Sequence, residues 1–182
     1  MLFRSHFRLY HKDAVFASLI PAEEWLYDWY GRCGYTRNIT CTPPPADVDN
    51  MDFATFDSWQ RTKDCVLLHD EEGFEIIKED HHISLSIDPN ACRETKETPA
   101  MIRIINAEKA LQLYANRHPE HAENIRVYND SDIPMNNIYF QIKQGHVVRT
   151  NHPLPDTRSL TIAELADYIF KDDNLEMNLM LN

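Results

Sequence analysis

Residues 64–88 of this chain, DCVLLHDEEGFEIIKEDHHISLSID, constrain its fold more than any other stretch. They hold the densest apolar runs of the sequence, together with eight acidic residues and three of the nine histidines. The apolar runs 65–69 and 74–78 flank a turn-forming segment at 70–73, which predicts a β-hairpin. In residues 82–88 apolar and polar side chains alternate, which predicts a half-buried third strand. These three strands would form the centre of a sheet.

The rest of the sequence predicts helices and strands in irregular order. Asn106 and Thr161 suit helix N-caps, and Glu164 completes a capping box with Thr161. Hairpins with short turns, such as the one at Gln144 and Gly145, pair antiparallel strands. We therefore predict an α+β fold with a mainly antiparallel sheet and three to four helices packed on it. Strands are expected at 2–10, 101–105, 125–128, 138–143 and 147–149, and helices at 21–31, 52–59, 107–118 and from Thr161 onward, with a helical turn at 14–20.

Length and composition predict one domain. A chain of 182 residues, 43% of them hydrophobic, can build one sizeable core and is short for two, so we expect residues 1–182 to form a single α+β domain. No regular element can run through the three consecutive prolines of the irregular segment 38–50. The segment is either a surface excursion or a hinge between the N-terminal helices and the sheet, and we favour the excursion. No apolar run approaches the roughly 20 residues of a membrane span. The four cysteines form no CxxC pair, which favours reduced thiols and a cytoplasmic protein.

The formal net charge of −11 is concentrated in one part of the chain. Residues 41–98 contain 14 acidic and 5 basic residues, whereas residues 1–40 and 99–150 each carry a net charge of +1 and residues 151–182 carry −4. A negative field repels nucleic-acid phosphates and attracts basic protein surfaces. We therefore expect a basic protein partner, such as a nucleic-acid-binding protein, and no direct binding to nucleic acid or membrane.

The glycines argue against nucleotide cofactors. Only four occur, and neither GxGxxG nor GxxxxGKS/T is present, so no loop is predicted to hold a phosphate through clustered backbone N–H groups. The GxSxG sequence of α/β-hydrolases is also absent. We expect no cofactor.

The acidic segment suggests a function in protein binding. We interpret the chain as a non-enzymatic acidic module, of the inhibitor, immunity or anti-defence kind, which mimics nucleic acid and occupies a basic groove on its partner. Such fields speed association and weaken with salt. The residues expected to bind the partner are Asp70, Glu71, Glu72, Glu75, Glu79 and Asp80.

Two other functions stay open. His69, His81 and His82, with neighbouring carboxylates, could serve a small metal-dependent hydrolase, although no fixed ligand spacing such as HExxH occurs. Alternatively, the chain is a structural or assembly subunit, with an oligomer contact at Trp25, Trp29 and Tyr30. The favoured interpretation of those aromatic residues, with Leu26, is nevertheless core packing. The sequence does not determine the oligomeric state.

Overall fold

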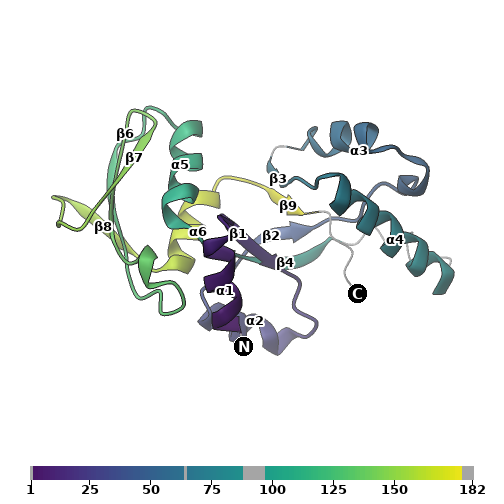
Figure 1. Cartoon of the computed structure of the whole chain (residues 1–182), viewed down its shortest axis with the longest axis horizontal. Helices are drawn as coiled ribbons and strands as arrows, with labels where there is room; N and C mark the ends of the chain where they lie inside the picture. Colours follow the sequence, from purple (N-terminus) through teal and green to yellow (C-terminus); the bar gives the residue numbers. More distant parts are fainter. Residues whose placement is uncertain (1, 64, 88–96, 178–182) are drawn as a thin grey trace. The chain divides into compact units, whose positions relative to one another are not determined.

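The structure is a computed structural model that describes residues 2–63, 65–87 and 97–177. These residues form six α-helices and two β-sheets (Figure 1), which confirms the α+β class. The chain divides into two compact units, one made of residues 1–38 and 101–172 and the other of residues 39–100 and 173–182. The expectation of a single domain stays a prediction.

The first unit contains a four-stranded sheet with the order β7-β6-β5-β8. β5 (Glu123–Val127) pairs antiparallel with β6 (Tyr139–Lys143), and β6 pairs antiparallel with β7 (His146–Thr150). β8 (Thr157–Leu160), which the sequence did not predict, lies parallel to β5. The sheet is therefore mixed, with two antiparallel pairings and one parallel pairing, rather than purely antiparallel.

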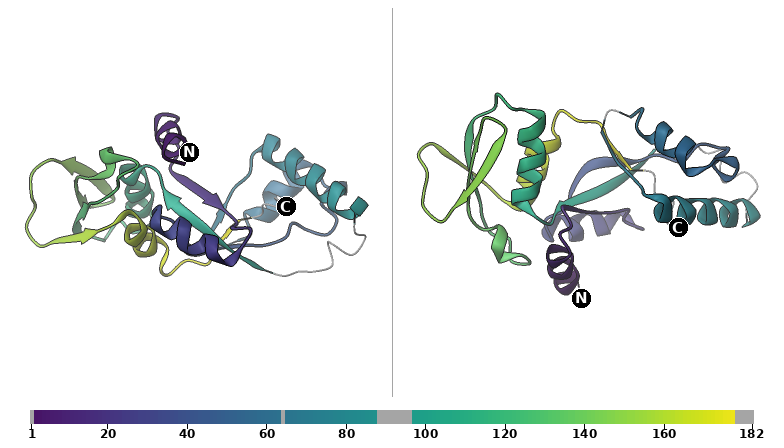
Figure 2. Two further views of the ribbon diagram at one scale, coloured as in Figure 1. Left: turned by 90° about the horizontal axis from the view of Figure 1, so that it is seen from below. Right: turned by 45° about the horizontal axis from the view of Figure 1, so that its top comes forward.

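Two helices cover one side of this sheet, α5 (Ala107–Arg117) and α6 (Ile162–Phe170) (Figures 1 and 2). Asn106 caps α5 by accepting a hydrogen bond from the Lys109 N–H at 3.1 Å, and Thr161 and Glu164 form the predicted capping box of α6. The core between the helices and the sheet includes Ala110, Leu111, Ile125, Phe140, Ile142, Leu165 and Ile169. Both helices are confirmed because each has an N-cap and an apolar stripe at helical spacing.

The same unit contains α1 (Leu2–His11), β1 (Phe16–Leu19) and α2 (Glu24–Arg32). The unit boundary falls within β2 (Thr36–Cys41) and β4 (Thr98–Ile104), and β1 pairs antiparallel with residues 101–104. The predictions of a strand at 2–10 and of a helical turn at 14–20 are both wrong. Residues 2–11 are helical and bury His6, while residues 16–19 are extended because β4 supplies their hydrogen bonds.

The second unit has a short parallel set of strands and two helices. β9 (Leu175–Met177) pairs in parallel with β3 (Cys65–Leu67) and with residues 40 and 41 of β2. The 3₁₀-helix η1 (Val48–Asn50) precedes α3 (Phe53–Gln60) and α4 (Glu71–Ile87). Their core consists of Val48, Phe56, Phe74 and Ile77, with the Phe56 and Phe74 rings stacked 4.8 Å apart.

α4 overturns the hairpin and the third strand predicted at residues 65–88. Residues 71–87 form one helix of 17 residues, in which Phe74, Ile77 and His81 are buried at a spacing of three and four. Short apolar runs fit a helix and a strand equally well, and here packing against α3 and η1 selects the helix. This error and the one at α1 explain why six helices are present instead of three to four. Asp88 lies outside the described residues.

The aromatic residues of α2 do not form the predicted core stripe. The buried residue of this helix is Tyr27, whereas Trp25 is 61% exposed and Trp29 is 39% exposed. In the described part of the chain no helix is both long and apolar enough to cross a membrane. A cytoplasmic location stays a prediction.

Candidate functional site

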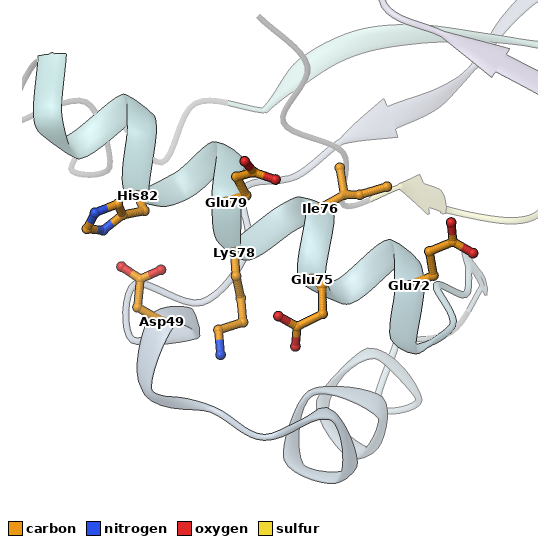
Figure 3. Close-up of a pocket in the computed structure, with 7 residues that line it drawn as sticks. All are labelled: Asp49, Glu72, Glu75, Ile76, Lys78, Glu79 and His82. Atoms are coloured by element: carbon orange, nitrogen blue, oxygen red, sulfur yellow. The ribbon is translucent and has the colours of Figure 1, made fainter.

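The acidic residues predicted to bind a partner all lie in the second unit, along α4 and at its start. Asp70 accepts a hydrogen bond from the Gly73 N–H at 2.9 Å, so it serves as the N-cap of the helix. Glu72, Glu75 and Glu79 line an open groove together with Lys78. In the view of Figure 3 the side chains of Glu72 and Glu79 point toward one edge of α4 and those of Glu75 and Lys78 toward the other, although all four line the groove. Glu71 and Asp80 belong to the same helix, and the six acids do not converge on one point.

The three histidines considered for a metal site are also separated. The buried His81 shares a hydrogen bond between its Nδ1 and Oδ2 of Asp49 at 2.9 Å, whereas His82 is exposed on the groove side. Burial lowers the pKa of His69. Among the described residues no three His, Cys, Asp or Glu side chains are grouped so as to hold a metal ion.

A better candidate site is a set of three buried polar side chains in the first unit, which hydrogen bonds connect. His6 of α1 is 1% exposed; its Nδ1 lies 2.8 Å from Oδ2 of Asp132, and its Nε2 lies 3.0 Å from the Tyr35 hydroxyl oxygen. Because a carboxylate only accepts hydrogen bonds, Nδ1 carries the proton and donates it to Asp132. Nε2 of the neutral ring is then an acceptor, and the Tyr35 hydroxyl donates to it. Asp132, His6 and Tyr35 therefore form a directed line of hydrogen bonds.

The protonation states of this line follow from its burial. Burial lowers the pKa of His6, although the hydrogen bond to Asp132 opposes this effect, so the imidazole is neutral at pH 7. Burial also raises the pKa of Tyr35 to about 12, which keeps its hydroxyl protonated. Nε2 of the neutral His6 already accepts the hydrogen bond of the Tyr35 hydroxyl, so it can take up that hydroxyl's proton when a base is needed.

Arg103 and Asp130 hold Asp132 in place. Arg103, which is 1% exposed, donates from Nη2 to Oδ1 of Asp130 at 2.6 Å, and its Nη2 lies 3.8 Å from Oδ2 of Asp132. Asp130 accepts further hydrogen bonds from the Asp132 and Ile133 N–H groups and from the Asn136 side chain. The loop that carries Asp132 is therefore fixed by charged hydrogen bonds to a buried arginine of β4.

Tyr35 forms part of the wall of an open groove in the same unit. The groove is lined by residues of α2, β2 and α6, and it contains three cations, Arg32, Arg37 and Lys171, and two acids, Asp28 and Asp167. Arg37 lies over the Tyr27 ring at 4.2 Å, and Asp167 accepts a hydrogen bond from Asn38 at 2.6 Å and another from the Thr36 hydroxyl. Tyr35, the last residue of the buried line, thus lines a groove that can hold both anionic and cationic groups.

A second polar cluster joins α6 to the sheet. The Tyr168 hydroxyl donates to Oε2 of Glu123 at 2.6 Å and lies 2.7 Å from Nε2 of His121, while Nε of Arg158 donates to the other oxygen of Glu123. Burial and the hydrogen bond to Glu123 raise the pKa of Tyr168. Because these groups are hydrogen-bonded to one another and connect α6 to β5 and β8, we assign this cluster to the packing of α6 on the sheet.

The fold is similar to the folds of solved structures. The chain is similar to Eis1 of Mycobacterium abscessus, with 14% identity, a TM-score of 0.50, and coverage of 93% of this chain and 67% of that one. It is also similar to a GCN5-related N-acetyltransferase of Anabaena variabilis, with 12% identity, a TM-score of 0.57, and coverage of 91% and 65%. The chain therefore spans about two thirds of the length of each structure. No protein-family model matches the sequence, and no curated protein matches it.

These similarities correct the function predicted from the acidic segment. The fold is one that N-acetyltransferases adopt, so the interpretation as a non-enzymatic binding module, and with it the inhibitor, anti-defence and nucleic-acid-mimic assignments, is wrong. The hydrolase and assembly-subunit alternatives are not retained either. No finding tests the expected basic partner. The error arose because charge was used as evidence for function, although acidic surfaces are common in proteins of every class.

Sequence patterns did not single out His6, Tyr35 or Asp132. The three residues are separated by up to 126 positions and belong to no motif with fixed spacing. One signal was present: the loop NDSDIPMNN at 129–137 combines two acids with three asparagines around Ile133, which is buried. A loop that is both polar and buried must satisfy many hydrogen bonds internally, and such loops often position functional groups.

Proposed function

We propose that this chain carries an acyltransferase site, which transfers an acyl group from a coenzyme A thioester to an amine. The observation that supports it most is the line Asp132–His6–Tyr35, whose last residue lines a groove containing three cations, in a fold that N-acetyltransferases share. Arg32 and Lys171 would hold the phosphates of the donor, because cations bind phosphate oxygens through charge-assisted hydrogen bonds. Asp28 and Asp167 would hold a cationic group elsewhere on the acceptor, whereas the amine that reacts is neutral.

The buried residues would move the proton that this reaction releases. As the amine nitrogen bonds to the thioester carbonyl carbon, its proton passes to the Tyr35 oxygen, and the Tyr35 proton passes to Nε2 of His6. Asp132 stabilises the resulting imidazolium. When the carbon–sulfur bond breaks, the proton returns from His6 through Tyr35 to the thiolate, so the products are an amide and a free thiol and the site is unchanged.

The test measures thiol release and amide formation from acetyl coenzyme A with a panel of primary amines. Tyr35→Phe should lower kcat by about 10²- to 10⁴-fold, the usual contribution of a positioned proton-transfer group, while leaving the thermal midpoint nearly unchanged. Tyr30→Phe is the matched control, because Tyr30 packs against Tyr35 with ring centres 5.6 Å apart and belongs to none of the hydrogen bonds of the line. Equal kcat values for the two variants would contradict the proposal.

The pH profile gives an independent check. Because burial lowers the pKa of His6, the base stays neutral below its ordinary titration range, and activity should persist to below about pH 6.5 before it falls. Absence of activity with every amine at saturating donor, in protein that binds acetyl coenzyme A, would refute the assignment of this site to amine acylation.

A further inference from the structure

Among the described residues, no helix packs on one face of the four-stranded sheet of the first unit. α5 and α6 pack on the other face, where Ile125, Phe140 and Ile142 are buried (Figure 1). The strand registers determine which side chains point outward: Asn124 is opposite Gln141 and Thr157, and Arg126 is opposite Tyr139 and Ser159. On the next strand Val148 is opposite Gln141, and His146 is opposite Lys143. We call this outward side the open sheet face.

The open sheet face carries no acidic side chain. Its charged or titratable members are Arg126, Lys143 and His146, all exposed, and within the described structure neither Arg126 nor Lys143 forms an ion pair. The acids Glu123 and Glu108 lie toward the helix side, where they pair with Arg158 and Arg149. In a chain with a net charge of −11, a whole sheet face without a carboxylate is a locally cationic surface.

The net charge of the chain is also distributed unequally between the two units. The first unit contains 13 basic and 13 acidic residues, whereas the second contains 5 basic and 16 acidic residues, so the second accounts for the whole net charge. The acidic segment that argued against nucleic-acid binding therefore does not belong to the unit that carries the open sheet face.

Two tyrosines flank the central cation of this face. The guanidinium of Arg126 lies 5.9 Å from the ring centre of Tyr128 and 5.5 Å from that of Tyr139. Tyr128 is 37% exposed, although tyrosine rings usually pack into the core when they can. Tyr139 is half-buried. Accessible tyrosine rings and a guanidinium plane on a sheet are stacking platforms for nucleobases, and the neighbouring cations match a phosphate backbone.

We propose that the open sheet face binds single-stranded RNA. Bases would stack on Tyr128 and Tyr139, and Arg126 and Lys143 would contact phosphates. The amide and hydroxyl side chains around them supply donors and acceptors for base edges and for the 2′-hydroxyl groups that distinguish RNA from DNA. These are Asn124, Gln141, Thr150, Thr157 and Ser159. A four-stranded sheet is wider than the grooves of a duplex, so paired nucleic acid is a poorer fit. This inference does not depend on the proposed acyl transfer.

The test uses fluorescence anisotropy with a labelled oligouridine RNA of about ten nucleotides, long enough to cross four strands spaced about 4.8 Å apart. The full chain should bind it with a dissociation constant in the micromolar range at low salt. The double variant Tyr128→Ala/Tyr139→Ala should weaken binding at least tenfold, because each stacked base contributes substantially to affinity. Lys143→Ala should reduce the dependence of affinity on salt.

Arg149→Ala is the matched control for Arg126→Ala. Both arginines lie on exposed positions of the same sheet, but Arg149 is on the helix side and pairs with Glu108 at 3.4 Å. Arg126→Ala should weaken RNA binding about tenfold and Arg149→Ala by less than twofold. Equal effects of the two variants, equal affinity for oligothymidine DNA or for a duplex, or full binding by the double tyrosine variant would each overturn the proposal. Acyl transfer by Arg126→Ala should equal that of the unmodified chain, so a failure of this proposal is distinguishable from a failure of the previous one.

Discussion

Gly34 offers a sharp test of how the candidate site is held together, because alanine should be tolerated poorly there and well at Gly31, three residues earlier. Gly34 has φ +85°, and a Cβ built on it would lie 2.5 Å from Cγ2 of Ile162. At Gly31, inside α2, a Cβ would meet no atom within 4 Å. The two substitutions add the same methyl group to neighbouring positions, so their difference isolates backbone conformation and packing.

The expected loss for Gly34→Ala has two parts. A left-handed backbone costs a residue with a Cβ roughly 1–2 kcal/mol. Forcing a methyl into Ile162 costs about 1–3 kcal/mol, because that side chain is 4% exposed and belongs to the capped first turn of α6. A total of about 3 kcal/mol should lower the thermal midpoint by about 6–12 °C for a chain of this size. Gly31→Ala should instead raise stability by about 0.5–1 kcal/mol, because it removes a helical glycine.

Thermal and urea unfolding, followed by circular dichroism, measure both effects. The double variant Gly34→Ala/Ile162→Ala separates the two parts: removing Cγ2 of Ile162 should recover about 1–3 kcal/mol relative to the sum of the single changes, and the backbone part should remain. If both alanine variants shift the midpoint in the same direction, or if the double variant shows no coupling, the reasoning about this close approach is refuted.

Three further predictions concern the polar groups of the first unit. Asp130→Asn should cost about 3–5 kcal/mol in urea unfolding, because it leaves the buried Arg103 with a weaker partner, and a change below 1 kcal/mol would contradict that role. Since burial lowers the pKa of His6, the stability from its neutral form is present above about pH 6.5 and should be lost as the pH falls through the folded-state pKa. In the His6→Gln variant the thermal midpoint should therefore change less between pH 7.5 and pH 5.5 than in the unmodified chain. Thr161→Ala removes one half of the α6 capping box and should cost about 1 kcal/mol, whereas Thr161→Ser should cost much less.

The sequence predicted an element correctly where several local signals favoured the same structure. α5 and α6 each combine an N-cap with an apolar stripe, and the turn at Gln144 and Gly145 has φ values of 52° and 75° that suit a tight hairpin. In these segments propensity, capping and periodicity favour the same structure, so the elements were predicted with bounds close to those observed.

Where the local signals were ambiguous, packing against neighbouring elements determined whether a segment became a helix or a strand. Residues 71–87 contain apolar runs that suit either a strand or a helix, and the core around Phe56 and Val48 accepts Phe74 and Ile77 only at helical spacing. Residues 16–19 are a strand because β4 lies beside them. Trp25 and Trp29 could not be recognised as exposed, because the periodicity of a helix shows which residues share a face and not which face is covered.

The sequence by itself determined the α+β class, the caps and cores of α5 and α6, and the concentration of acid in residues 41–98. Tertiary structure alone decided the candidate site, because His6, Tyr35 and Asp132 come from segments far apart in the chain and contact one another only after α1, β2 and the 129–137 loop have packed. It also decided that a sheet face free of carboxylates exists, since the strand register assigns each side chain to one face or the other. Hydrogen bonds between distant residues and the charge of a surface both depend on distances between segments. Packing sets these distances, and local sequence does not.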